Sequence, residues 1–219
     1  MHLPILALYR ATAPGTFDDG TASGIFKQAV AGAVTLGRNG LDGDVQVDRS
    51  VHGGADQALH HYPAEHYPRL ATAFPRAARD LVPGSIGENL ATHGLAEADV
   101  CLGDVFAVGA VRLQVTAPRR PCWKIDRRYD ARGMAAFIID AGLTGWYYRV
   151  LDGGTLAAGA QMACIERLPC APSIAEFHAT LRAVRPPREA LERFADLGAL
   201  PAAWRRRLRE RLDWLRRHP

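Results

Sequence analysis

Hydrophobic and polar residues alternate along several short runs in the first three quarters of the chain. In residues 111–115, apolar side chains at the odd positions alternate with Arg112 and Gln114. Another apolar run, 105–108, lies just before it, and the two-residue connection between the runs begins with Gly109. Strict alternation places apolar residues on one face of a strand, and a two-residue connection with glycine is typical of a hairpin. This region therefore predicts an antiparallel hairpin with one buried face.

Two further runs have the composition of strands. Residues 1–8 are largely apolar, but they lack a basic leader and contain Pro4, so they predict a first strand rather than a signal peptide. Residues 147–151 predict another strand, which we expect to end at Asp152 and the two glycines after it.

Two helices are expected to interrupt these strands. One begins near Pro63, because proline suits the first helical turn, and Pro68 makes it short or kinked. The other spans about 131–141 and stops at Gly142, since glycine commonly follows the last helical turn.

After Leu168 the pattern changes to that of helices. Ser173 and Glu176 have the spacing of a capping box, a helix after Pro187 ends near Gly198, and another starts after Pro201. The apolar residues that we assign to the buried faces of the three helices are Ile174, Phe177, Leu181 and Val184, then Leu191 and Phe194, then Trp204, Leu208, Leu212 and Leu215. The sequence thus predicts an α+β protein that is mainly β, with a β-rich domain over 1–168 and a small three-helix domain over 169–219.

Three short amphipathic helices are not expected to be stable alone. They must pack together, onto the β-rich domain or onto a second subunit. The apolar stripe of the third helix favours a homodimer in which the three-helix tail contributes to the interface. A chain truncated after Leu168 should then be a monomer or an aggregate.

Composition describes an ordinary globular chain. Of the 219 residues 48% are hydrophobic, and no apolar run approaches the roughly 20 residues that a membrane helix needs, so we expect no membrane contact. Four cysteines form no CxxC pair, which favours reduced thiols in a cytoplasmic protein. Much of the net charge of +4 comes from arginines in 205–217. We interpret these arginines as a solvated helix face and do not expect nucleic-acid binding, because no known reader motif accompanies them.

The segment from Pro118 to Lys124 contains Cys122, the residue with the clearest chemical potential. It lies just beyond the predicted hairpin strand, and Arg119, Arg120 and Lys124 surround it. Fixed positive charges next to a thiol favour the thiolate, which is the nucleophile and the metal ligand. The alternative is a structural cysteine at a strand end beside solvated arginines.

Two histidine clusters are less specific. His52 precedes two glycines and follows an acidic stretch that lacks the ligand spacing of an EF-hand, so it either faces a ligand or lies exposed in a turn. His60, His61 and His66 are close in sequence, but adjacent side chains point apart in a strand or helix. We therefore do not expect a zinc site there.

The stretch 84–90 is a glycine-containing turn whose amides could hold an anion, and Asn89 offers both donors and an acceptor. It is not a Walker A loop, and the chain contains no GxGxxG fingerprint and no GxSxG elbow. Binding of NAD or ATP in the usual way and serine hydrolase chemistry are therefore not expected.

An ordered set of short motifs resembles the MOSC domain, named after the C-terminal domain of molybdenum cofactor sulfurase, and is most similar to its YiiM subfamily. Each motif is weak alone, but their order is specific, and the resemblance covers nearly all of the chain. The motifs are Gly40-Leu41-Asp42-Gly43-Asp44, His52-Gly53-Gly54 with Asp56, Gly87-Glu88-Asn89-Leu90, Gly103-Asp104, Pro118-Arg119 with Pro121-Cys122, and Gly145-Trp146-Tyr147.

This resemblance implies a barrel-like β fold that binds the molybdenum cofactor, a pterin dithiolene with a terminal phosphate. It implies that Cys122 ligates molybdenum. Lys27 matches a family lysine that could contact the phosphate, and Asn89, Arg119 and Lys124 complete the expected cofactor-binding set. Soft thiolate ligands suit such a metal, and cations suit an anionic cofactor.

The resemblance also implies a reductase of N-hydroxylated compounds such as hydroxylaminopurine, with His52 or Glu88 as the proton donor. The sequence shows no flavin, nicotinamide or iron–sulfur signature, so a separate reductase is expected to supply electrons. Four aromatic residues are candidates for stacking on a flat base, and the alternative for each is a place in the core: Trp123, Tyr129, Trp146 and Tyr147. The rival function is a carrier of sulfur, as a persulfide on Cys122, or of the cofactor.

Overall fold

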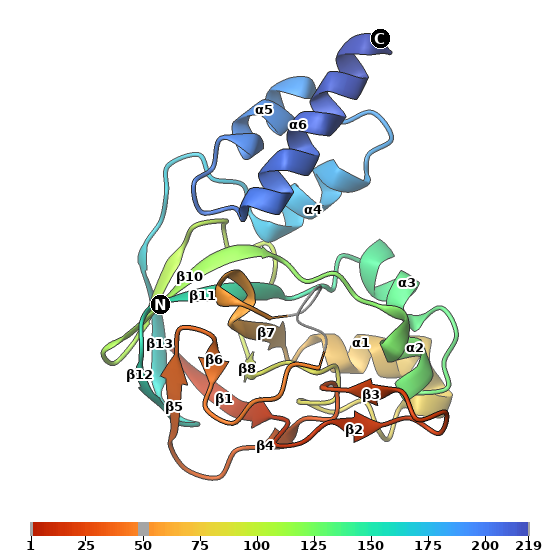
Figure 1. Cartoon of the computed structure of the whole chain (residues 1–219), viewed down its shortest axis with the longest axis vertical. Helices are drawn as coiled ribbons and strands as arrows, with labels where there is room; N and C mark the ends of the chain where they lie inside the picture. Colours follow the sequence, from red (N-terminus) through yellow and green to blue (C-terminus); the bar gives the residue numbers. More distant parts are fainter. Residues whose placement is uncertain (1, 48–52, 219) are drawn as a thin grey trace.

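The computed structural model describes residues 2–47 and 53–218. Seven strands form a closed barrel, because the first strand pairs with both the third and the last of them (Figure 1). The strand order around the barrel is β13, β9, β10, β11, β7, β8 and β1, and only β7 and β8 are parallel. The strands are β1 (His2–Arg10), β7 (Leu59–Pro63), β8 (Leu90–Thr92), β9 (Val105–Val108), β10 (Val111–Pro118), β11 (Trp146–Asp152) and β13 (Gln161–Glu166).

Short strands attach the segment between β1 and β7 to this barrel. β4 (Gln28–Ala29) pairs with the end of β1. β5 (Val34–Gly37) lies between β6 (Gly40–Leu41) and β12 (Gly154–Leu156), and β2 (Gly15–Thr16) pairs with β3 (Ala22–Ser23). Residues 15–47 are thereby held against the barrel, next to the segment that follows β10 (Figure 1).

The predicted hairpin is confirmed. Val111 pairs with Val108 across the connection at Gly109, and the apolar face of β10 is at most 1% exposed at Val111, Leu113 and Val115. β10 continues to Pro118, whose register partner is Trp146 on β11. The longer strand delivers the segment 119–122 to the end of the barrel.

The helices before residue 168 differ from prediction at their starts. α1 (His66–Ala73) does not begin near Pro63, because that proline is the last residue of β7 and pairs with Thr92. α3 (Met134–Asp140) begins after Gly133, whose φ of +90° is incompatible with helix, and ends as predicted before Gly142 at φ +68°. The chain also contains α2 (Trp123–Arg128), which the pattern did not reveal, and the 3-10 helices η1 (Ala55–Gln57) and η2 (Pro75–Ala77).

The three C-terminal helices are confirmed as α4 (Ile174–Arg182), α5 (Arg188–Ala195) and α6 (Ala202–Arg217). Ser173 caps α4, since its Oγ accepts the Glu176 backbone N–H at 3.0 Å. Val184 was wrongly assigned to the buried face: α4 ends before it, and the side chain is 90% exposed. Among the described residues, no helix is both long and apolar enough to cross a bilayer.

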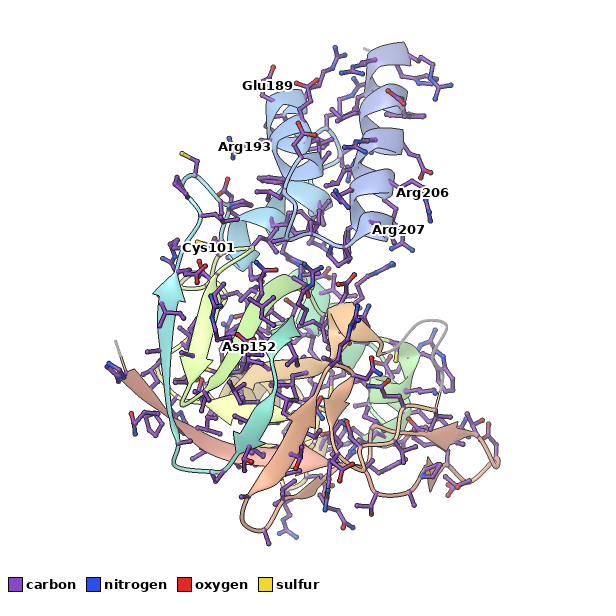
Figure 2. The ribbon with its side chains drawn as sticks, turned by 60° about the vertical axis from the view of Figure 1, so that its left-hand side comes forward. Cys101, Asp152, Glu189, Arg193, Arg206 and Arg207 are labelled. Carbon is purple, nitrogen blue, oxygen red and sulfur yellow. The ribbon has the colours of Figure 1, made fainter. Side chains whose placement is uncertain are left out.

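The three helices stand as a bundle on one end of the barrel (Figures 1 and 2). The inner residues of α6, Leu208, Leu212 and Leu215, are at most 4% exposed and belong to the same hydrophobic core as Leu113 and Val115 of β10. The stripe of α6 is therefore buried within one chain. That burial removes the sequence-based reason for a dimer, and the homodimer and the domain boundary near residue 168 stay predictions.

Candidate functional site

A pocket opens where the segment after β10 meets residues 23–47 and the strand β7. Its enclosed part has a volume of about 100 Å³, and the space including the open mouth is about 690 Å³. It unites five residues that the sequence proposed for cofactor binding: Lys27, Asn89, Arg119, Cys122 and Lys124. The other lining residues are Ser23, Gly24, Ile25, Asp44, Val45, Gln46, Val47, Gly53, Gln57, His60, Gly87 and Tyr147.

Cys122 lies in extended backbone directly before α2, and its thiol is free and partly exposed. The strand β10 and the helix α2 fix the two ends of the short segment that carries it. A thiol at a pocket wall, next to cations, is available to a metal or an electrophile.

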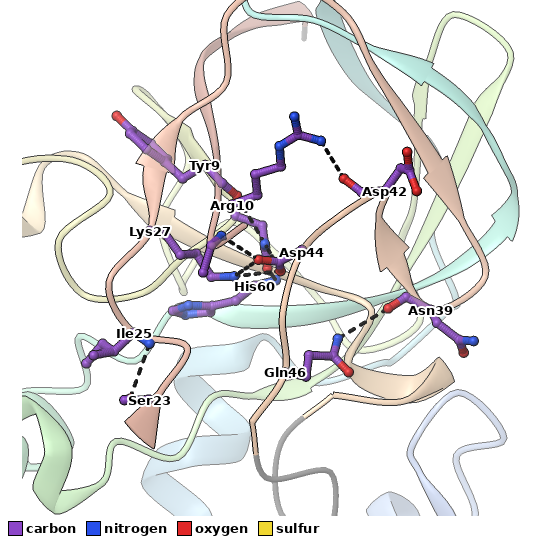
Figure 3. Close-up of polar contacts among 12 residues, drawn as sticks. Tyr9, Arg10, Ser23, Ile25, Lys27, Asn39, Asp42, Asp44, Gln46 and His60 are labelled. Carbon is purple, nitrogen blue, oxygen red and sulfur yellow. Dashed lines mark hydrogen bonds and ion pairs between the residues drawn. The ribbon is translucent and has the colours of Figure 1, made fainter. Parts of the chain in front are cut away.

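Lys27 and Asp44 form a buried ion pair in the pocket wall (Figure 3). The Nζ–Oδ2 distance is 2.6 Å, and the two side chains are only 7% and 3% exposed. Asp44 also accepts hydrogen bonds from Asn89 Nδ2 and from the Ala11 backbone N–H, both at 2.8 Å. Burial lowers the pKa of Lys27, and the attraction of Asp44 opposes that change. The pair is thus held firmly, and its two charges compensate.

Arg119 and Lys124 supply the positive charge that remains. Arg119 is 7% exposed, and its Nη2 donates to the Ile86 carbonyl at 3.1 Å while its Nη1 has no partner among the described residues. Lys124 Nζ donates to the Ala22 carbonyl at 3.3 Å and pairs with no carboxylate in the described chain. The pocket therefore favours an anionic ligand.

His60 is a pocket residue that the sequence reading missed. Its side chain lies at the wall and is 3% exposed, and neither Nδ1 nor Nε2 has a hydrogen-bond partner in the described structure. Burial, and then the charge of Arg119, hold the pKa of this imidazole well below its usual value, so the ring is neutral. A neutral imidazole offers one donor and one acceptor to a ligand.

Gly145 explains why His60 can sit there. A Cβ at this position would lie 3.0 Å from His60 Nε2 and 2.2 Å from the carbonyl oxygen of His61, and its φ is +60°. Only glycine allows the start of β11 to approach β7 this closely. No local pattern around residue 60 could have indicated this contact.

Unsatisfied buried polar atoms concentrate at the pocket. Seven buried side-chain nitrogen and oxygen atoms lack a hydrogen-bond partner in residues 2–47 and 53–218, and four of them belong to Gln57, His60 and Arg119. All three residues line the pocket. Buried polar groups without partners are costly, so their gathering at one cavity indicates a site that binds a polar ligand.

Glu88 does not line the pocket. It is fully buried and accepts hydrogen bonds from Tyr67 Oη and from the backbone N–H groups of Gly84 and Ile86. Burial raises the pKa of its carboxyl group. In the structure Glu88 holds the 84–87 turn, whose Ile86 carbonyl anchors Arg119, and its role as a proton donor stays a prediction.

The two remaining candidates from the sequence are His52 and Asn89. His52 lies outside the described residues. The side chain of Asn89 lies at the pocket, but it already donates to Asp44 and to the Tyr9 carbonyl and accepts from the His60 N–H. It positions those residues, and its contact with a cofactor stays a prediction.

The three clustered histidines have different partners, and the four aromatic candidates lie in different parts of the structure. His61 bonds Tyr148 Oη and Thr92 Oγ1, whereas His66 pairs with Glu97 at 2.8 Å. Of the four aromatic candidates, only Tyr147 lines the pocket. Trp146 is fully buried in the core, Trp123 is 54% exposed, and Tyr129 donates to the Ser85 carbonyl at 2.6 Å.

Comparison with known proteins yields one family. The family described as MOSC domain matches residues 48–163. Protein YiiM of Escherichia coli (strain K12) is 40% identical over 152 residues, 69% of this chain and 68% of that protein. The crystal structure of YiiM from Geobacillus stearothermophilus has a TM-score of 0.81 and 31% identity, and covers 96% of this chain and 99% of that one. A protein named reductase from Gibberella moniliformis (strain M3125 / FGSC 7600) is 35% identical over 146 residues, 66% of this chain and 26% of that protein.

Proposed function

This chain belongs to the MOSC domain family, which confirms the resemblance of its sequence, and we propose that it is a molybdenum cofactor-dependent reductase of N-hydroxylated compounds such as hydroxylaminopurine. One observation carries the proposal: the partly exposed thiol of Cys122 shares a pocket with the cations Lys27, Arg119 and Lys124. A soft ligand and an anion site are what a metal dithiolene with a phosphate requires.

The donor set of the pocket fits this cofactor. Arg119 Nη1 and the ring of His60 are buried polar groups without partners, so a bound molecule with oxygen and nitrogen atoms would satisfy them. Cys122 would hold the metal, and Arg119 and Lys124 would hold the phosphate. A phosphate contact of Lys27, whose charge Asp44 compensates, stays a prediction. When bound, the cofactor would supply the two-electron redox chemistry that cleavage of an N–O bond requires.

The reaction itself is balanced by two electrons and two protons. The N–O bond of R–NHOH breaks, and the products are R–NH₂ and water. The neutral imidazole of His60, which is 3% exposed at the pocket wall, can donate a hydrogen bond to a ligand oxygen. Arg119 supports the negative charge of the bound group.

The similarity to the protein named reductase from Gibberella moniliformis supports the assignment of this chain to the oxidoreductases. The matching segment is only 26% of that protein, so most of its length lies outside the part shared with this chain. We propose that electrons reach this chain from a separate reductase, since no dinucleotide fingerprint is present in its sequence.

The test is expression in a host that makes the cofactor, followed by measurement of molybdenum and pterin content. We expect the loaded protein to reduce hydroxylaminopurine to adenine and an amidoxime to its amidine with reduced viologen. It should show no dehydrogenase activity with NAD alone. A fully loaded protein that reduces neither compound, but carries a labile persulfide on Cys122, would replace this function with sulfur transfer.

Arg119→Ala should lower the affinity for the phosphate-bearing cofactor. A charge-assisted hydrogen bond contributes about 1.5–3 kcal/mol, so we expect about a ten- to hundredfold loss, read as the pterin retained after dialysis. Arg216→Ala is the control, because Arg216 pairs with Glu192 and Asp213 on the bundle. Equal cofactor loss in both variants would show that Arg119 has no specific role.

His60→Leu should separate activity from stability. The substitution removes a buried ring whose nitrogens lack partners, so we expect the free energy of unfolding to stay within about 0.5 kcal/mol or to rise. We expect kcat/KM to fall by about fivefold, since one ligand hydrogen bond contributes about 1 kcal/mol.

The neighbouring residue gives a matched control. His61→Leu strands Tyr148 Oη and Thr92 Oγ1 in the core, so it should cost about 2 kcal/mol or more of stability. A His60→Leu protein as unstable as His61→Leu would make residue 60 a structural histidine. Urea titration with kinetics on the loaded protein measures both effects.

A further inference from the structure

A second hollow lies along the segment that carries Cys122. It is open to solvent, with a volume of about 1200 Å³, and lies between residues 118–121, the end of α3, and helices α4 and α6. Arg119 lines both this hollow and the cofactor pocket. We call it the basic groove, defined by Arg119, Arg120, Arg182, Trp204, Arg207 and Arg211.

The lining of the basic groove contains five arginines and no carboxylate. Arg182 pairs with Asp140 of α3, and Arg211 donates to the Leu181 carbonyl. Arg120 and Arg207 are exposed and have no acidic partner in the described part of the chain, although the Arg207 guanidinium lies 5.9 Å from the Trp204 ring centroid. These two cations are free to bind an outside anion.

The charge of the whole chain is concentrated on the same side. Residues 169–219 carry 11 arginines and six carboxylates, whereas residues 1–168 carry 16 basic and 17 acidic side chains. The positive excess of the protein therefore belongs to the three helices. Arg206 and Arg207 lie near the barrel end of α6, where the bundle meets the barrel (Figure 2). A strongly positive surface beside a cavity attracts acidic partners and speeds their association.

The groove is also close to the reacting group. Arg120 is two residues before Cys122, and consecutive Cα atoms are about 3.8 Å apart, so the two Cα atoms lie within about 8 Å. A protein docked on Arg120 would thus stand directly against the segment that holds the thiol. A molecule that must deliver electrons to the pocket needs such a short path.

We propose that the basic groove is the docking surface for the acidic face of an electron-transfer protein that reduces the site at Cys122. The inference rests on the proposed function, which consumes two electrons and two protons for each N–O bond. Two molecules of a reduced one-electron carrier would each be oxidised by one electron in each turnover, and water would supply the protons.

Charge pairing on the bundle favours a protein over a nucleic acid. Outside the basic groove, the bundle pairs many of its arginines with its own carboxylates: Arg193 with Glu176, Arg206 with Glu210, Arg209 with Asp196, and Arg216 with Glu192. A nucleic acid needs a continuous track of cations along its backbone. Outside the groove, Arg185, Arg188 and Arg217 also pair with no carboxylate of the described residues, but each donates to a backbone carbonyl at the far part of the bundle. The unpaired cations next to the site, Arg120 and Arg207, lie together in the groove, which matches a compact acidic patch.

The experiment compares two double variants with equal change of net charge. Arg120→Glu with Arg207→Glu reverses the basic groove. Arg185→Glu with Arg217→Glu reverses two arginines near the end of α6, where Arg185 Nη1 donates to the His218 carbonyl at 3.1 Å. The C-terminus lies at the end of the bundle that is far from the barrel (Figure 1). The probes are two acidic carriers, a flavodoxin and a plant-type [2Fe–2S] ferredoxin, each kept reduced by NADPH and its reductase.

We expect at least one carrier to support turnover by the loaded wild type, with a KM that rises steeply between about 20 and 300 mM salt. The groove variant should raise the KM for that carrier by about tenfold or more, and the ratio of its carrier-driven to its viologen-driven kcat/KM should fall by a similar factor. The control variant should behave as wild type. Carrier binding to the wild type and to both variants, measured by interferometry, gives a readout that does not depend on catalysis.

Each other result would overturn the proposal. Equal carrier KM in the groove and control variants, or no binding of either carrier to the wild type, would exclude this docking surface. If the wild type binds a DNA duplex of about 20 base pairs, and the groove variant loses that binding while its carrier kinetics stay unchanged, the groove binds nucleic acid instead. Absence of viologen-driven activity in loaded wild type would instead contradict the proposed function, while the binding arm would still report on the groove.

Discussion

Replacement of Cys122 by alanine should abolish N-reduction and leave the fold intact. Its thiol is partly exposed and caps no helix N–H, so the loss of stability should stay below about 1 kcal/mol. The loaded protein should lose its molybdenum together with its activity, since the proposed role of this thiol is ligation. Metal analysis, pterin analysis and circular dichroism on the same preparations measure the three quantities.

The other cysteines provide the controls. Burial raises the pKa of Cys101 and of Cys164, and in both cases Asp104 adds to that rise, so these thiols are less suited to ligation. Cys101→Ala and Cys164→Ala should retain both metal and activity, with at most a small loss of stability. Wild-type activity and molybdenum content in Cys122→Ala would remove this residue from the site.

Asp44→Ala should be the most destabilising single change at the pocket. It leaves the Lys27 ammonium buried without its partner and removes the acceptor for Asn89 Nδ2. Removal of one partner of a buried ion pair costs about 3–5 kcal/mol. For a chain of this size that corresponds to a fall of about 6–20 °C in the melting temperature, measured by calorimetry.

Two comparisons isolate the cause of this loss. Asp42→Ala changes an exposed carboxylate only two residues away and should cost less than about 0.5 kcal/mol. Combining Asp44→Ala with Lys27→Met should restore part of the lost stability, because no buried ammonium is then left unpaired. If Asp44→Ala and Asp42→Ala have the same melting temperature, the Lys27–Asp44 ion pair contributes nothing to the stability of the fold.

The pocket itself shows how far local sequence signals reach. The thiol of Cys122 and its flanking cations could be proposed because they lie within one short segment after a clearly alternating strand. The pairing of Lys27 with Asp44 could not, since both belong to irregular segments whose relative position depends on the barrel. The same holds for His60, whose place depends on the close approach of Gly145, 85 positions later.

Two further residues lie in places that local signals did not indicate. Glu88 was one of two candidate proton donors, and the structure places its oxygens on the backbone N–H groups of its own turn and away from the pocket. Pro63 has a residue type that starts helices, but pairing with β8 makes it the end of a strand. In each case a tertiary contact overrode a local preference.

What the sequence alone determined are the features set by neighbours along the chain. Alternation in 111–115, the cap at Ser173 and the stripe of 204–215 each specify an element, because the side-chain period and the capping hydrogen bond are local. What only the tertiary structure decided is the partner of each face. The stripe could have been buried by a second subunit, and it is buried by the chain's own helices and barrel. The hydrophobic effect is non-directional, so an apolar face in the sequence indicates that it is buried but not which surface buries it. In this protein the closed barrel determines that surface, and it also determines where the pocket lies.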